Sequence, residues 1–359
     1  MIQPAKRLEF IDAMRGFTML LVVYSHVLIF GYHQNEITHV SFNQALSTFR
    51  MPLFFFISGF VLYKSTRIWR NELISFLRKK FLIQIIPTVF FLIVYDTVFA
   101  YDIKDSLLSG TKYGYWFTIT LFEYFLMYSM LAYLIEKVKY KWMGKMLCLI
   151  VSVATLFSAE GCAVIKHFVP EWCLDLFGLG MIRYFSFFFL GTIVKEYYSR
   201  FCQLTDNGLF MALTILSFFV SVLFCDYLDM VMPEGGFPFV FMFEFRFLLT
   251  GIFGVVVIFT FFRKKERLFT RDHTIGKCLQ YVGRRTLDIY FIHYFFLPRN
   301  LCMLGTYFTN ETNPSIEFLI SLLIAMWVVI LSVCVSNIIR LSDLLGHYLF
   351  GVKRKVNAG

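Results

Sequence analysis

The residues best suited to chemistry lie in the first hydrophobic segment, FIDAMRGFTMLLVVYSHVLIF, residues 10–30. Asp12, Arg15 and His26 interrupt an otherwise apolar stretch that is long enough to cross a hydrocarbon core. Ionisable residues inside a span are costly, so they usually face a bundle interior or a watery cavity and mark function. Arg15 and His26 would share one face of a helix, about 16 Å apart along its axis. We therefore predict a functional stripe that carries a cation and an imidazole.

Three explanations fit this stripe. In acyl transfer, a neutral imidazole takes the proton of an acceptor hydroxyl that attacks a thioester, and cytosolic arginines hold the phosphates of an acyl-CoA donor. In proton-coupled transport of a solute or glycan, His26 and the buried acids form a relay. In the third, the polar side chains only join helices. These residues alone leave all three open.

An arginine pair follows the second hydrophobic segment. Arg67 and Arg70 are spaced i, i+3, so on a helical turn they would project to the same side. Two guanidinium forks at that spacing suit a phosphate or pyrophosphate. A pair of arginines in a cytoplasmic loop is also a common topology signal. The spacing by itself is therefore compatible with either role.

The composition requires a membrane setting for these residues. Of the 359 residues, 58% are hydrophobic and 16% are charged, whereas soluble domains are about half apolar and about a quarter charged. The hydrophobic segments follow one another without a polar linker, so we predict an all-α, polytopic integral membrane protein. It would form a single domain over residues 1–359 with about ten transmembrane helices. The expected spans are 10–31, 46–63, 81–100, 113–135, 146–165, 179–194, 208–226, 239–262, 286–307 and 316–346.

The positive charge has a topological explanation. The formal net charge is +10, and most of the 34 lysines and arginines fall in alternate loops between these spans. Because basic residues concentrate in cytoplasmic loops, both termini are predicted to be cytoplasmic. The basic excess then serves topology and anionic lipid rather than nucleic acid, and we expect no nucleic-acid partner. The cysteines lack metal-binding spacing, so no metal is predicted.

Four stretches resemble the motifs of one family. The stretch RLEFIDAMRGFTMLLVVYSH, which ends at His26, resembles the signature of the acyltransferase-3 family of membrane O-acyltransferases, with ten residues between Arg15 and that histidine. FRMPLFFFISGF, RIWR and GRRTLDIYFIH resemble later motifs of the family, in the same order along nearly the whole chain. Ala13 and Thr286 stand where the family often has glycine and serine, and both are small residues.

The resemblance implies a function and roles for matched residues. His26 would be the catalytic histidine and Arg15 its paired basic residue, while Arg67 and Arg70 would handle acyl-CoA. Acetyl-CoA is the expected co-substrate, and the product would be an O-acetylated saccharide or glycolipid of the cell envelope. The protein would be a multi-pass component of the cytoplasmic (inner) membrane, in contact with membrane lipid. The family often carries an SGNH domain; we expect no appended SGNH or other soluble domain here.

The acceptor would meet the thioester near the outer side. His26 is about 24 Å along the helix axis from the start of the segment, hence in the outer half of the membrane. His26 would act as general base, directly or through an acyl-imidazole, and the sequence leaves both routes open. The candidates for acceptor binding are Arg50, Tyr113, Trp116, Arg183 and His293. His293 would either line the same cavity or be a core histidine bonded to a neighbouring helix.

Overall fold

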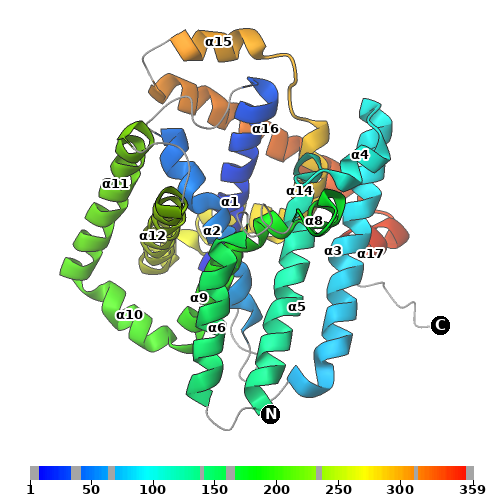
Figure 1. Ribbon diagram of the computed structural model, residues 1–359. Helices are drawn as coiled ribbons and strands as arrows, with labels where there is room; N and C mark the ends of the chain where they lie inside the picture. The colour runs from blue at the N-terminus through cyan, green and yellow to red at the C-terminus, as the bar shows by residue number, and fades with distance from the viewer. Residues whose placement is uncertain are drawn as a thin grey trace. The chain divides into compact units, whose positions relative to one another are not determined.

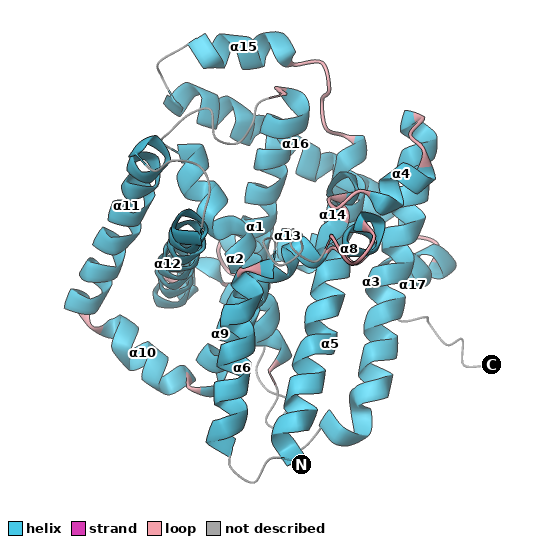
Figure 2. Ribbon diagram, viewed as in Figure 1, coloured by secondary structure: helices cyan, strands magenta, loops and turns pink. Residues whose placement is uncertain are grey.

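The computed structural model describes residues 8–33, 42–63, 69–137, 141–158, 166–231, 237–310 and 314–352. Within these ranges the chain consists of helices and short connections without a β-strand (Figure 2), which confirms the all-α prediction. The α-helices are α1 (Glu9–His26), α2 (Phe42–Leu62), α3 (Trp69–Phe99), α4 (Ile103–Leu108), α5 (Trp116–Lys137), α6 (Lys141–Leu156), α8 (Glu171–Leu176), α9 (Phe185–Glu196), α10 (Tyr198–Asp206), α11 (Gly208–Val231), α12 (Phe237–Lys264), α13 (Thr274–Arg284), α14 (Thr286–Ile292), α15 (Cys302–Asn310), α16 (Pro314–Ile339) and α17 (Asp343–Phe350). The other helical segments are η1 (Val27–Gly31), η2 (Lys112–Gly114), η3 (Leu179–Tyr184), η4 (Glu266–Phe269) and η5 (His293–Phe295).

Several helices have the length and apolar character of membrane spans. Among the described residues, 6 helices qualify, or 7 when a bent pair counts as one span. The six are Glu9–Gly31, Ala45–Leu62, Leu73–Phe99, Trp116–Leu134, Val240–Lys264 and Ser315–Ile339. The bent pair is α10 with the first part of α11, which meet at 85° (Figure 1). These helices indicate a membrane protein; the count of about ten spans and the cytoplasmic termini stay predictions.

Two segments that we expected as continuous spans are interrupted. Residues 286–307 form α14, η5, a non-helical stretch around Pro298, and then α15. Proline lacks a backbone N–H and disfavours helix in the residue before it, which favours a break here, although α2 and α3 continue through Pro52 and Pro87. Residues 179–194 begin as η3, and α9 has only 12 residues, about 18 Å of helix. Residues 286–307 are therefore not a single helix, and only the second part of 179–194 is α-helical.

Two helices end before the last residues of the spans predicted for them. α6 stops at Leu156, and residues 159–165 of that predicted span lie outside the described residues. α16 stops at Ile339, before the predicted end at 346. The chain then turns, and Ser342 begins α17 by accepting a hydrogen bond from the backbone N–H of Leu345 at 3.3 Å. A serine at this position satisfies one of the unpaired N–H groups of a helix start.

The chain divides into two compact units. Unit 1 comprises Met1–Ile57, Arg200–Met232 and Leu249–Asn337, and unit 2 comprises Ser58–Ser199, Pro233–Leu248 and Ile338–Gly359. The single domain over residues 1–359 stays a prediction.

Unit 1 is built on a close crossing of α1 and α13. Glu9 in the first turn of α1 favours the positive end of the helix dipole and accepts hydrogen bonds from the N–H of Arg271 and the amide of Gln280. A Cβ atom on Gly16 would collide with the backbone of α13, and one on Gly283 would collide with the carbonyl of Asp12. Glycine lets the two backbones touch. This crossing sets the position of α13 and of the α14 segment that follows it.

Unit 2 has its own close contacts. α3 and α5 run side by side (Figure 1), and the hydroxyls of Thr88 and Thr118 hydrogen-bond between them at 2.6 Å. α17 packs on α3, where the ring of Phe350 stacks on that of Phe91. A Cβ on Gly59 would collide with the carbonyl oxygen of Phe188 in α9. A small residue is therefore required here too.

Candidate active site

His26 occupies a special position on the backbone. It is the last residue of α1, after which the chain continues as the π-helical turn η1. Such turns occur frequently at functional sites. The side chain of His26 is half-buried, whereas Ser25 and Val27 on either side of it are buried. The imidazole therefore sits in the interior of unit 1 but retains some access from outside.

A second histidine contacts the first. Nδ1 of His26 lies 2.8 Å from Nε2 of His293, the first residue of η5. The two ring planes differ by 8° and their centroids are 5.1 Å apart. This geometry is an in-plane hydrogen bond rather than a face-to-face stack, because the rings are parallel and too far apart for stacking contact. His293 is fully buried, and its Nδ1 lies 2.9 Å from the carbonyl oxygen of Ile289.

Aromatic rings and one cation surround this pair. The ring of Tyr294 lies 5.1 Å from that of His26, and Phe30 meets the same imidazole edge-on at 5.7 Å. Arg50 of α2 is close enough to act electrostatically on His26 and on Tyr24. Two residues predicted separately, Arg50 and His293, are therefore brought to His26 by the fold.

Arg15 lies on the same helix as His26. α1 is continuous from Glu9 to His26, so helical geometry applies and both side chains project from one face, about 16 Å apart along the axis. Arg15 is half-buried, and Asp12, one turn earlier, is buried. The functional role of Arg15 stays a prediction.

Asp288 anchors the segment that carries His293. Its Oδ2 accepts hydrogen bonds from the hydroxyl of Ser336 at 2.5 Å and from the guanidinium of Arg285 at 3.5 Å. Arg285 also donates to the Ser336 hydroxyl at 3.0 Å. The buried carboxylate thus ties α14 to α16. Its contribution is to hold η5 in place, beside the end of α1.

Three predicted acceptor residues belong to unit 2. Arg183 pairs with Glu244 at 3.3 Å, and its guanidinium lies 4.0 Å from the ring centre of Phe247. The ring of Trp116 stacks on that of Tyr184 at 5.9 Å. Tyr113 stacks on Tyr101 at 4.7 Å. Each residue has local packing partners, and a part in acceptor binding stays a prediction for all three.

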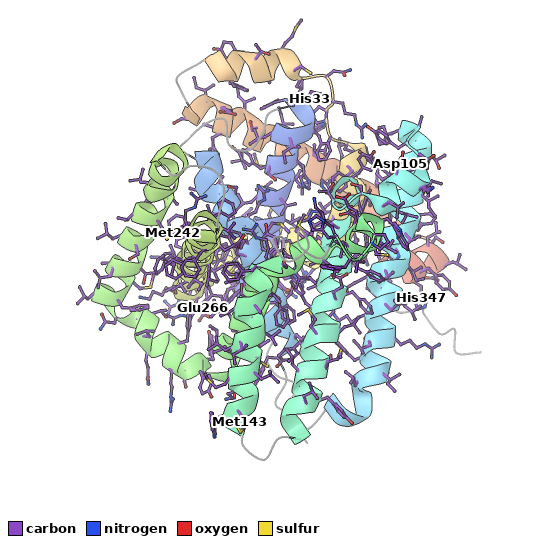
Figure 3. The ribbon with its side chains drawn as sticks, in the orientation of Figure 1. His33, Asp105, Met143, Met242, Glu266 and His347 are labelled. Atoms are coloured by element: carbon purple, nitrogen blue, oxygen red, sulfur yellow. The ribbon has the colours of Figure 1, made fainter. Side chains whose placement is uncertain are left out.

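The arginine pair predicted to bind phosphate lies at the edge of the described residues. Arg67 is outside the described residues; Arg70 is in the first turn of α3, and its side chain is not among those described. Among the described residues, no group of three or more His, Cys, Asp or Glu side chains could hold a metal ion. His33, labelled in Figure 3, follows η1 and is exposed, with its Nε2 3.2 Å from the carbonyl oxygen of Arg299.

A family model described as an acyltransferase domain matches residues 8–341. The chain belongs to the acyltransferase-3 family. The match includes both histidines of the pair and covers nearly all the chain. An acyltransferase-3 protein with several long apolar helices is a membrane acyltransferase. No curated protein and no solved structure matches the chain significantly.

Sequence reasoning about this acyltransferase-3 protein missed the pairing of the two histidines. They are separated by 267 positions, and helical periodicity fixes the face of a side chain but not its partner on another helix. The usable signal was that each histidine ends a stretch resembling a family motif. The π-helical turn after His26 and the contact of Tyr294 with the imidazole had no such signal.

Proposed function

We propose that this protein is an O-acyltransferase that moves an acetyl group from acetyl-CoA on the cytosolic side to a hydroxyl of an extracytoplasmic or lipid-linked saccharide. His26 is the general base. The observation that carries the proposal is the half-buried imidazole of His26, whose one protein hydrogen bond among the described residues is made through Nδ1. Nε2 is therefore left for a reacting hydroxyl.

The proposed reaction uses that nitrogen twice. The acceptor hydroxyl gives its proton to Nε2 while its oxygen bonds to the thioester carbonyl carbon. The carbon–sulfur bond then breaks, and the departing thiolate takes the proton back from the imidazolium. In the alternative route the same nitrogen first carries the acyl group as an acyl-imidazole. Both routes end with an acylated saccharide and free CoA thiol.

Positive charges supply the remaining parts of the proposal. Arg67 and Arg70, together with Arg15 of α1, are the residues proposed to hold the donor phosphates at the cytosolic side. The flexible pantetheine arm then reaches along α1 to His26. Arg50 lies near the imidazole and is the acceptor-binding residue that the geometry supports best. Tyr113, Trp116 and Arg183 of unit 2 are the other residues proposed to bind the acceptor.

The test is transfer of label from acetyl-CoA to saccharide by the protein in vesicles. Replacing His26 with Ala should lower the rate by about 10²–10⁴-fold or to background, because proton transfer is lost, while the unfolding temperature changes little. His347→Ala is the matched control, since His347 lies on α17, bonded to the carbonyl of Val352 (Figure 3).

Two results would contradict the proposal. Full transfer by the His26→Ala protein would remove His26 as the base. Solute uptake driven by a proton gradient without acetyl-CoA, lost on the same substitution, would favour the transporter that the sequence left open.

A further inference from the structure

We infer that His293 is a positioning residue that locks His26 in the tautomer with its proton on Nδ1 and its lone pair on Nε2. The inference rests on the proposed function, because it explains how the base is prepared for acyl transfer. It assigns His293 a role other than acceptor binding: the residue acts through His26 and does not touch the substrate.

The first step concerns the protons of His293. Its Nδ1 lies 2.9 Å from the carbonyl oxygen of Ile289. A carbonyl oxygen only accepts hydrogen bonds, so Nδ1 must carry a proton. A neutral imidazole has one N–H, and His293 is fully buried, where an unpaired charge would be costly. Nε2 of His293 is therefore the acceptor nitrogen.

The second step passes this constraint to His26. Nδ1 of His26 lies 2.8 Å from that acceptor nitrogen, so Nδ1 of His26 must donate. The neutral His26 ring then has no proton on Nε2, and this nitrogen is a base before any substrate arrives. One backbone carbonyl thus fixes the tautomers of two rings in succession.

Contacts of the neighbouring residues fix the orientation of these two hydrogen bonds. Ile289 and His293 lie one helical turn apart, so the backbone that carries the carbonyl also carries the ring that uses it. Asp288, next to Ile289, is tied to Ser336 of α16. The ring of Tyr294 packs 4.0 Å from that of His293. Few orientations of His293 other than the observed one are compatible with these contacts.

The same arrangement acts during the reaction. When Nε2 of His26 takes the proton of the hydroxyl, Nδ1–H remains directed at His293, and this neutral acceptor stabilises the positive ring. The proton does not pass on to Ile289, because Nδ1 of His293 already carries one. It stays on Nε2 and returns to the departing thiolate, so no proton is gained or lost over the cycle.

Histidine NMR tests the tautomer directly. In ¹⁵N-histidine-labelled protein, the His26 signal, assigned by its loss in His26→Ala, should show a protonated Nδ1 and an unprotonated Nε2. In His293→Phe, which keeps a ring but offers no acceptor nitrogen, the signal should become a mixture of both tautomers. A His26 protonated on Nε2 in the unmodified protein, or the same tautomer in both proteins, would overturn the inference.

Kinetic measurements test whether this positioning of His26 affects the rate of acetyl transfer. His293→Phe should lower kcat for acetyl transfer by about 10²-fold or more with little change in the KM for acetyl-CoA, because the base is in the wrong tautomer for part of the time and its positive form loses the acceptor that stabilises it. His293→Asn, whose amide oxygen can accept a hydrogen bond, should recover part of kcat and also covers the case in which the phenylalanine variant fails to fold. An unchanged kcat in His293→Phe, or equal losses in both folded variants, would contradict the role.

Failure of the inference is distinguishable from failure of the proposed function. If His26→Ala is inactive and His293→Phe keeps the normal kcat and tautomer, His26 is the base but His293 does not position it. If His26→Ala remains active, the proposed base itself is wrong.

Discussion

The two units each contain a buried polar pair that joins segments far apart in the sequence, and the pairs differ in what they leave unused. In unit 2, Arg183 and Glu244 are oppositely charged, and the Glu244 side chain is 0% exposed. In unit 1, His26 and His293 share one hydrogen bond, and one imidazole remains half-buried. The two charges of the ion pair offset each other, whereas in the histidine pair His26 is half-buried and, on the proposed function, keeps Nε2 for the reacting hydroxyl.

The difference teaches how to separate structural polar residues from catalytic ones. Burial and an unusual position in an apolar segment describe Glu244 as well as His26, so neither criterion identifies a catalytic residue. On the proposed function, the deciding property is a basic nitrogen in a partly exposed residue that can meet the acceptor hydroxyl. The three predictions below, each with its control, either test this contrast or refine it.

The largest effect on stability is expected from breaking the ion pair of unit 2. Glu244→Ala would leave the guanidinium of Arg183, which is 17% exposed, without its carboxylate, at a cost of about 3–5 kcal/mol in the free energy of unfolding. The remaining folded protein should keep its kcat. Chemical unfolding in detergent, with kinetics on the folded fraction, measures both.

An exposed ion pair of the same unit provides the control. Lys145 and Glu196 pair at 2.7 Å with side chains that are 46% and 30% exposed, so Glu196→Ala should cost less than about 1 kcal/mol. Equal losses of unfolding free energy in the two variants would show that the buried pair stabilises the fold no more than the exposed pair does. A raised KM for the saccharide in Glu244→Ala would instead support the predicted part of Arg183 in acceptor binding.

The next effect comes from the glycine contacts, which each unit has. Gly283→Ala in unit 1 and Gly59→Ala in unit 2 both place a methyl group against a backbone carbonyl, so each should cost about 1–3 kcal/mol through overpacking. Only Gly283→Ala should also reduce kcat, because α13 leads into the segment that carries His293. Thermal unfolding and turnover of the folded fraction distinguish the two.

Gly208→Ala controls for the loss of backbone freedom alone. Nothing lies within 4 Å of a Cβ added at Gly208, so the substitution should be close to neutral. If Gly59→Ala lowers kcat as much as Gly283→Ala, the crossing of α1 and α13 is not what positions the histidine pair.

Features set by the period of one helix could be predicted from the sequence, whereas contacts between helices could not. The apolar run and the spacing of Arg15 and His26 predicted a helix with both residues on one face, and α1 is continuous between them. Such features are local, since they depend on the period of one helix. The pairing of His26 with His293 depends on the crossing at Gly16 and Gly283, a tertiary contact that no local period encodes.

The helical continuity expected for residues 286–307 was wrong for a related reason. Pro298 was a local signal for a break, but the apolar residues on both sides of it favoured one continuous span over 286–307. Apolar character reports burial and not helical continuity, so it cannot separate a span from a broken segment packed inside a unit. That break allows the short segment with His293 to meet the end of α1.

The smallest effect is a pH dependence in unit 2, at a buried lysine outside the spanning helices. Lys112 is 1% exposed and donates to the carbonyl oxygens of Asp175 at 2.6 Å and Ser109 at 3.3 Å. Burial lowers the pKa of Lys112 from its ordinary 10.5, and the nearby carboxylates of Glu123 and Asp175 oppose that shift. The folded protein therefore releases this proton at a lower pH than the unfolded chain does.

The lowered pKa of Lys112 determines how the free energy of unfolding changes with pH. Between the lowered pKa and 10.5 the unfolded chain binds more protons, so the free energy of unfolding should rise as pH increases through this window. Lys112→Met should remove this rise, whereas Lys104→Met, at an exposed lysine of α4, should keep it. Unfolding measured across the window compares the three proteins, and equal pH slopes in all three would contradict the prediction.

A rise carried by Lys112 would show that unit 2 also has a buried group able to change its charge. Capacity to titrate would then be insufficient to mark a catalytic residue, and access to the reacting hydroxyl would be the property that sets His26 apart.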